Sequence, residues 1–175
     1  VTFDAKLYNR CHALARMQDY CMIHKFAPDL LPRNRKTNSL QMKHLDFGAG
    51  MGGNATYSNI LLKASYTAIE AHQWSYDIQR LFFGKLADKG RPYLDVLAAE
   101  SMELVPEKLE NEILSNKYAI KRIPSWFFEK IEDNSYNLVT ATNVLNELNT
   151  SAIIYMLANS KRVLQKNGYV YIRDS

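Results

Sequence analysis

Short runs of alternating apolar and polar residues recur along this chain, separated by longer segments whose apolar residues have helical spacing. The short runs predict strands at 42–47, 65–69, 118–123, 136–142 and 169–173. The longer segments predict helices at 4–26, 54–63, 73–89 and 150–165. This alternation predicts an α/β fold with a doubly wound, mainly parallel sheet and helices on both faces. If the strands are numbered along the chain, their expected order across the sheet is 3-2-1-4-5, because right-handed crossovers leave few other topologies.

The same spacing predicts which side of each helix is buried. The expected apolar faces are Leu7, Leu14, Met17, Met22 and Ile23 in the first helix, Trp74, Ile78, Leu81, Phe82 and Leu86 in the third, and Ile153, Ile154, Leu157 and Val163 in the last. Residues 90–117 fit less well, because Gly90, Pro92 and Pro106 interrupt them. We expect a helical insertion over the sheet edge there.

The domain organisation follows from the breaks near the start of the chain. Pro28 and Pro32 end the first helix, and the polar stretch 33–41 is typical of a linker. We therefore predict an N-terminal helical segment over 1–32 and a ligand-binding domain over 42–175.

Four glycines follow the first predicted strand within six residues, in the sequence LDFGAGMGGN that ends at Asn54. Glycine allows a tight turn and a close approach of the backbone to a ligand. A strand, glycine turn and helix build a nucleotide-type cofactor site at the carboxyl edge of a parallel sheet. The pattern leaves the cofactor open, because Gly48, Gly50 and Gly53 satisfy G-x-G-x-x-G while Gly48, Gly50 and Gly52 satisfy G-x-G-x-G.

Asp46 narrows this choice. It lies two residues before the first glycine, where a dinucleotide-binding strand usually has a buried apolar side chain. A carboxylate there suits a ligand with an ammonium group, such as the methionine part of S-adenosylmethionine. The stretch resembles the first motif of the class I S-adenosylmethionine-dependent methyltransferases, in which an acidic residue leads into G-x-G-x-G.

Three further stretches extend the resemblance over about residues 43–173. Glu70 ends the second predicted strand, where the family has an acid that binds the adenosine ribose. Residues 136–148 resemble the fourth strand and its loop, and 163–170 resemble the turn before the fifth strand, although its usual proline and first glycine are absent. Since the family fold continues beyond this strand, the resemblance implies that C-terminal strands are missing.

The resemblance implies S-adenosylmethionine as the cofactor. The residues it implies for cofactor binding are Asp46, Gly48, Ala49, Gly50, Gly52, Glu70, Ala71, Ser125, Trp126 and Asn143. Many family members have an acid after the third strand; here Ser125 would bind the adenine amino group instead, and Trp126 would lie on the ring or in the core. Candidate catalytic bases are Glu147, which is equally suited to capping a helix, and His72, which is also placed to contact adenine.

Composition removes several other classes of protein. The 175 residues are 47% hydrophobic and 23% charged, which is typical of one globular domain. The net charge of +4 is mild and comes partly from a basic run over 33–44, so a small-molecule partner is favoured over nucleic acid. The longest apolar run, 152–158, is too short for a membrane span, and we expect a cytoplasmic protein. No metal site is predicted, because Cys21 and His24 on one helix face are only two ligands.

The function expected from these features is S-adenosylmethionine-dependent methyl transfer, with O-methylation of a small molecule such as a sugar as the favoured reaction. An RNA methyltransferase remains an alternative within the same family. From other classes, a nicotinamide-dependent dehydrogenase and a non-catalytic cofactor-binding fragment also remain. The acceptor and the oligomeric state are not predicted.

Overall fold

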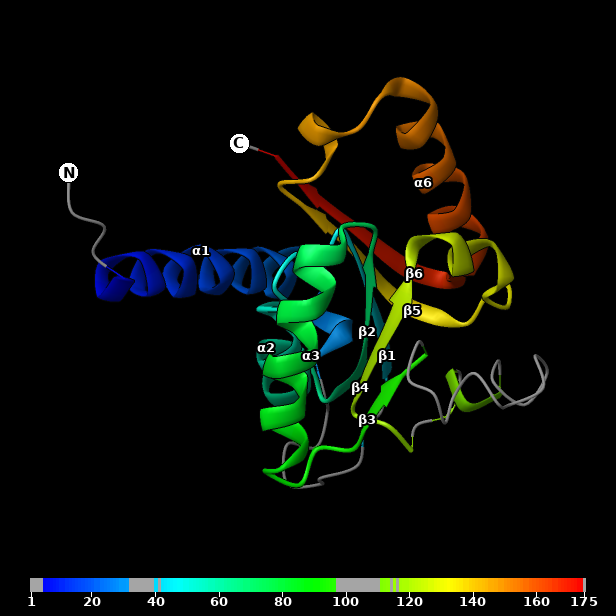
Figure 1. Ribbon diagram of the computed structural model, residues 1–175. Helices are drawn as coiled ribbons and strands as arrows, with labels where there is room; N and C mark the ends of the chain where they lie inside the picture. Colours follow the sequence, from blue (N-terminus) through cyan, green and yellow to red (C-terminus); the bar gives the residue numbers. More distant parts are fainter. Residues whose placement is uncertain are drawn as a thin grey trace.

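The computed structural model describes residues 5–31, 40, 42–96, 111–113, 115 and 117–174, with side chains from Ala13 onward. Its centre is a six-stranded sheet in the order β3-β4-β2-β1-β5-β6, in which every pair of neighbours is parallel (Figure 1). The strands are β1 Met42–Phe47, β2 Ala64–Glu70, β3 Tyr93–Asp95, β4 Ile120–Pro124, β5 Tyr136–Thr142 and β6 Leu164–Arg173. The five predicted strands therefore lie in the predicted order, with β1 at the centre.

The sixth strand, β3, is a difference from the sequence prediction. Tyr93–Asp95 pairs with β4 at the edge of the sheet, so the expected helical insertion is wrong for these residues. Three residues are too few to show an alternating pattern. A buried ion pair between Asp95 and Arg122 holds the strand in place. Within the expected insertion, residues 111–113 are helical and 97–110 lie outside the described residues.

Helices cover both faces of the sheet, as predicted (Figure 1). One face carries α1, α2 and α3, and the other carries η3 and α6. Helix α2 continues as the π-helical turn η2. The bounds are α1 Ala5–Phe26, η1 Pro28–Leu30, α2 Asn54–Tyr57, η2 Ser58–Leu62, α3 Gln73–Ala87, η3 Ser125–Lys130, η4 Leu145–Glu147 and α6 Thr150–Val163. Because both faces are covered, the central strands β1 and β2 are buried almost throughout.

The predicted faces of the helices are partly wrong. In α1, Leu14, Met17 and Met22 are exposed, whereas Tyr20 and Ile23 pack against the sheet. In the other two helices the exposed residues are Trp74, Leu81, Ile154 and Leu157, and the buried ones are Tyr76, Phe83, Met156 and Val163. One residue is about 100° of helix, so a small error in phase moves a side chain from core to surface. The buried sides of α1 and α3 also include Asp19 and Gln79, which an apolar pattern does not detect.

The connection from α6 to β6 also differs from the prediction. The helix ends at Val163 and the strand begins at Leu164, without a turn at 167–168. The pairing moves from Tyr136↔Leu164 to Leu138↔Tyr169, so extra residues of β6 bulge between these pairs. Among the described residues, no helix is both long enough and apolar enough to cross a membrane.

Candidate functional site

A cavity of about 720 Å³ opens at the carboxyl edge of the central strands. This volume is in the range of small-molecule sites. Its walls come from α1, the glycine turn, α2, the ends of β1, β2 and β5, the first residue of η3, one side of α3, and the loop that contains η4. The lining residues are Ala13, Arg16, Phe47, Gly48, Gly50, Met51, Gly53, Thr56, Tyr57, Ile69, Glu70, Ala71, His72, Trp74, Ser75, Phe82, Ser125, Thr142, Asn143, Val144, Glu147 and Leu148. The glycine turn and the end of β2 thus meet at one site, as the sequence predicts.

Gly50 is one of three glycines on the cavity wall, with Gly48 and Gly53. Its φ is +54°, and a Cβ built on it would have no atom within 4 Å. At Gly48 and Gly52, by contrast, a Cβ would collide with Val144 and Phe83. These two glycines serve the packing of the turn, whereas Gly50 leaves space for a ligand against the main chain.

Glu70 fixes the glycine turn to the end of β2. Its Oε2 accepts a hydrogen bond from the Gly50 nitrogen at 2.8 Å, and its Oε1 accepts from the nitrogens of Ala71 and His72 at 2.8 and 2.9 Å. On the other side of the turn, Gln79 Nε2 donates to the Gly50 oxygen at 2.5 Å. A carboxylate has about four acceptor positions, so Glu70 retains capacity to accept from a ligand hydroxyl on the cavity wall.

Asp46 lies beneath the glycine turn, away from the cavity wall. Its side chain accepts from Asn54 Nδ2 at 2.9 Å, from the Tyr66 hydroxyl at 2.6 Å and from the Thr140 hydroxyl at 2.5 Å. These donors join β1 to α2, β2 and β5. These contacts give Asp46 a positioning role beneath the turn, and its pairing with a ligand ammonium group stays a prediction.

His44 extends this buried network. Its Nε2 lies 2.8 Å from the Thr140 hydroxyl and its Nδ1 lies 2.9 Å from the Ser58 hydroxyl. Because Thr140 donates to Asp46, its oxygen accepts from His44, which places the proton on Nε2 and makes Nδ1 the acceptor from Ser58. Burial lowers the pKa of His44 to about 4, although Asp46 acts in the opposite direction. The ring is therefore neutral at pH 7.

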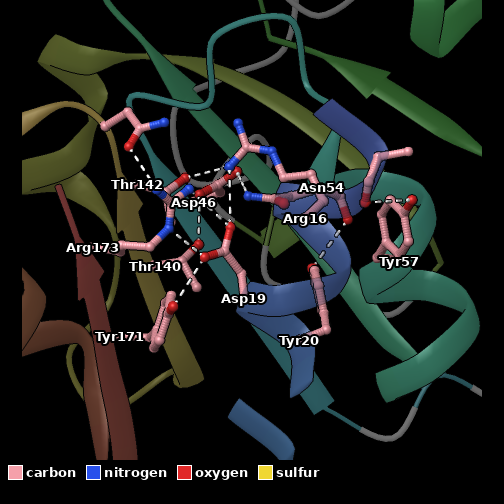
Figure 2. Close-up of polar contacts among 12 residues, drawn as sticks. Arg16, Asp19, Tyr20, Asp46, Asn54, Tyr57, Thr140, Thr142, Tyr171 and Arg173 are labelled. Atoms are coloured by element: carbon pink, nitrogen blue, oxygen red, sulfur yellow. Dashed lines mark hydrogen bonds and ion pairs between the residues drawn. The ribbon is translucent and has the colours of Figure 1, made fainter. Parts of the chain in front are cut away.

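The far end of the cavity contains a group that the sequence did not indicate (Figure 2). Arg16 of α1 lines the cavity and donates from its Nη1 to the Thr142 hydroxyl at 2.6 Å. Asp19, one turn further along α1, accepts from Arg173 Nε at 2.5 Å and from the Tyr171 hydroxyl at 2.9 Å. No motif connects these residues, because they come from opposite ends of the chain.

Asn143 belongs to the same end of the cavity. It has a left-handed backbone with φ of +55°, and its nitrogen donates to the Arg173 oxygen at 2.8 Å. Its Oδ1 accepts from Arg173 Nη1 at 3.0 Å. The contacts of one β6 residue thus hold the loop after β5 in place.

The structure brings eight of the predicted site residues onto the cavity wall: Gly48, Gly50, Glu70, Ala71, His72, Ser125, Asn143 and Glu147. The lining does not include Asp46, Ala49, Gly52 or Trp126. Trp126 is 57% exposed and meets Phe127 edge-on, which also excludes the core position considered for it.

Both candidate bases lie on the wall of the cavity. Glu147 ends η4 and His72 precedes α3, and both side chains are exposed. The capping alternative for Glu147 does not hold for α6, because the cap there is Asn149, whose Oδ1 accepts from the Ala152 nitrogen at 2.9 Å. Among the described residues, no group of three or more His, Cys, Asp or Glu side chains is arranged to hold a metal ion.

No family model matches this sequence, and no curated protein matches it either. Solved structures do match its backbone. A protein of Galdieria sulphuraria, to which sarcosine dimethylglycine methyltransferase activity has been ascribed, superposes with a TM-score of 0.57 at 18% identity, over 89% of this chain and 46% of its own. The geranyl diphosphate C-methyltransferase of Streptomyces coelicolor A3(2) gives 0.56 at 10% identity, over 92% and 46%.

A third structure matches at the same level. The phosphoethanolamine N-methyltransferase 2 of Haemonchus contortus, in complex with S-adenosyl-L-methionine, gives a TM-score of 0.53 at 14% identity, over 89% of this chain and 27% of its own. This chain has the class I methyltransferase fold. It spans less than half the length of each of these structures. At such low identity the class I methyltransferase fold is what the likeness establishes, and the chemistry is argued from the cavity.

Proposed function

We propose that this domain binds S-adenosylmethionine and transfers its methyl group to a small molecule. The observation that carries the proposal is the cavity at the carboxyl edge, where the open Gly50 backbone lies beside the Glu70 carboxylate. S-adenosylmethionine supplies an electrophilic methyl group when it is bound. The remaining tasks of the protein are to orient the ligands, to exclude water and to accept a proton.

Five of the wall residues have a proposed role in cofactor binding. Glu70 accepts a hydrogen bond from a ribose hydroxyl, for which its carboxylate has about one acceptor position left. Ser125, directly after β4, and Ala71 lie beside the adenine. Gly50 allows the ligand to lie against the turn, and Asn143 bounds the space on the side of β5.

For the acceptor, we propose a small molecule methylated on oxygen, with a sugar as the favoured class. A hydroxyl must lose its proton when it is methylated, and Glu147 and His72 offer two bases on the wall. The solved relatives are named as methyltransferases that act on nitrogen or carbon, so the acceptor atom rests on this chemical argument alone. An RNA acceptor would need a basic surface, to which the basic run at 33–44 would contribute. Most of this run lies outside the described residues. A cytoplasmic location stays a prediction.

Thermal unfolding with and without ligand tests the cofactor. A ligand that binds only the folded state raises the unfolding midpoint, so S-adenosylmethionine should raise it and NAD should not. A rise with NAD alone would support the dehydrogenase alternative. If neither compound changes the midpoint, the enzyme assignment should be dropped in favour of a non-catalytic fragment.

The candidate base is tested separately, once an acceptor is found. Glu147→Gln keeps the shape of the side chain but cannot take up a proton, so the rate should fall while cofactor affinity is unchanged. His72→Gln is the matched variant at the other candidate. The substitution that lowers the rate identifies the base, and unchanged rates in both variants would contradict a base at either position.

A further inference from the structure

The cavity carries opposite charges at its two ends. β2 and β5 lie on either side of β1, so Glu70 at the end of β2 and Thr142 at the end of β5 mark opposite sides of the glycine turn. Arg16 reaches the second of these sides from α1, and its side chain is 19% exposed on the cavity wall. A ligand that fills the cavity therefore meets a carboxylate at one end and a guanidinium at the other.

Among the described residues, Arg16 shares its carboxylate partner with a second arginine, Arg173. That carboxylate is Asp19, whose Oδ2 lies 3.6 Å from Arg16 Nη1, beyond hydrogen-bonding distance. Asp19 is instead committed to Arg173, which donates to it from Nε at 2.5 Å and from Nη2 at 3.2 Å, and to Tyr171 (Figure 2). Arg173 thus compensates Asp19, and the Arg16 guanidinium keeps donors for a ligand.

Helix α1 is also fixed next to the glycine turn. The Tyr20 hydroxyl donates to the Asn54 oxygen at 3.1 Å, and the Tyr57 hydroxyl donates to the Ala13 oxygen at 3.4 Å. The rings of Tyr20 and Tyr57 stack with 5.6 Å between their centroids. These contacts join α1 to the helix that follows the turn, so the position of Arg16 relative to Gly50 is defined.

We propose that Arg16 binds the carboxylate of the ligand's amino-acid part and is a specificity residue of this site. This inference rests on the proposed function. A guanidinium presents a planar fork of N–H donors that matches a carboxylate, and such charge-assisted bonds are stronger than neutral ones. The N-terminal helix then belongs to the binding site, and the ligand spans the cavity with its diol at Glu70 and its anionic group at Arg16.

Two ligands separate this role from a structural one. S-adenosylhomocysteine and 5′-methylthioadenosine share the adenosine and the thioether, but only the first has the amino-acid part. Arg16→Gln should weaken S-adenosylhomocysteine binding by about tenfold or more and leave 5′-methylthioadenosine within about twofold, measured by calorimetry. Arg16→Lys should recover part of the loss, because it restores the charge without the fork.

Lys25→Gln is the matched control, because it removes one positive charge from an exposed position of the same helix. It should change neither affinity. An equal loss of both ligands in Arg16→Gln would overturn the inference, since it would show that Arg16 only holds α1 in place. Unchanged affinity for S-adenosylhomocysteine would overturn it as well.

A measurement on the unaltered protein covers the case in which Arg16→Gln does not fold. S-adenosylhomocysteine whose carboxylate has been converted to an amide should bind about tenfold or more weakly than the parent compound. Equal affinities would overturn the role of Arg16 while leaving the proposed function intact. If the unaltered protein binds neither S-adenosylmethionine nor S-adenosylhomocysteine, the proposed function fails first, and this inference fails with it.

Discussion

The two ends of the cavity are built in different ways. At the Glu70 end, one side chain binds the nitrogens of Gly50, Ala71 and His72, which lie at most 20 residues away. At the Arg16 end, the contacts join side chains 126 and 154 residues apart, from Arg16 to Thr142 and from Asp19 to Arg173. The Glu70 end is a local motif that can be recognised in the sequence. The Arg16 end depends on tertiary contacts of the first helix with β5 and β6.

The two ends also differ in what holds them. Backbone amides fix the Glu70 carboxylate, so changing this residue disturbs the glycine turn itself. Side chains fix Arg16 and Asp19, so these residues can be changed while the turn keeps its contacts.

The largest effect is expected for Gly50→Val, because Gly50 lies on the cavity wall in the glycine turn, between the Glu70 end and the Arg16 end. The new side chain would project into the open space at the cavity wall and would require a φ near +54°. S-adenosylmethionine binding should be abolished, with no ligand-dependent rise in the unfolding midpoint.

Gly90→Val is the matched control for Gly50→Val. Gly90 has φ of +79° and also has no atom within 4 Å of a built Cβ, but it lies in the turn after α3, away from the cavity. Both variants should lose about 1–2 kcal/mol of stability from the left-handed backbone, and only Gly50→Val should lose binding. Retained binding in Gly50→Val would place the ligand elsewhere.

The second effect concerns the buried network that joins the strands under both ends. The pKa of His44 is about 4 in the folded protein and about 6.5 when unfolded, so between these values the unfolded state binds more protons. The free energy of unfolding should therefore fall as the pH falls, by about 2 kcal/mol from pH 6.5 to 5. Urea unfolding at both pH values measures this loss, and His44→Gln should remove it.

His24→Gln provides the comparison for this pH effect, because His24 is exposed on α1. It should leave the pH dependence of stability as it is. If His44→Gln retains the full dependence, the buried imidazole is not its source.

The third prediction concerns the Glu70 end of the cavity and is to be compared with Arg16→Gln at the other end. Glu70→Ala should weaken S-adenosylhomocysteine and 5′-methylthioadenosine equally, by about 1–3 kcal/mol, because both ligands carry the ribose. It should also lower the free energy of unfolding, since three backbone nitrogens lose their acceptor. Calorimetry of a folded variant tests the first part. A loss confined to S-adenosylhomocysteine would mean that the ligand lies in the opposite direction.

The smallest effect is expected beside the adenine. Ser125 lines the cavity, and Ser125→Ala should weaken binding by about 0.5–1.5 kcal/mol through the loss of one hydrogen bond. Trp126 is its immediate neighbour but is exposed and absent from the lining, so Trp126→Ala should leave the affinity unchanged. Titration of both variants with S-adenosylhomocysteine makes the comparison, and the reverse order of effects would show that the indole contacts the ligand.

The parts of the fold that the sequence predicted are those whose signal is local. Five strands and the glycine turn were predicted, because buried strands alternate and glycines mark the turn. The strand β3 was missed because three residues carry no pattern, and the buried side of α1 was misassigned because it includes Asp19 and Tyr20.

The candidate site follows the same rule. Glu70 was found from its place at a strand end, and the structure puts it on the cavity wall. Asp46 stands correctly before the glycines, but its side chain turns to Tyr66 and Thr140, which no spacing reveals. Arg16 could not be found, because its partner Thr142 lies 126 residues away and neither residue belongs to a motif.

The pairing of Asp19 with Arg173 has a consequence for the order of events during synthesis. Helix α1 leaves the ribosome early, yet its buried carboxylate meets its guanidinium partner only after β6 has been made. Until then, Asp19 lacks its partner, and the polar side-chain contact that joins α1 to the sheet is the one from Arg16 to Thr142 of β5. The Glu70 end can form from the first two strands alone, so the nascent chain completes one end of its cavity long before the other.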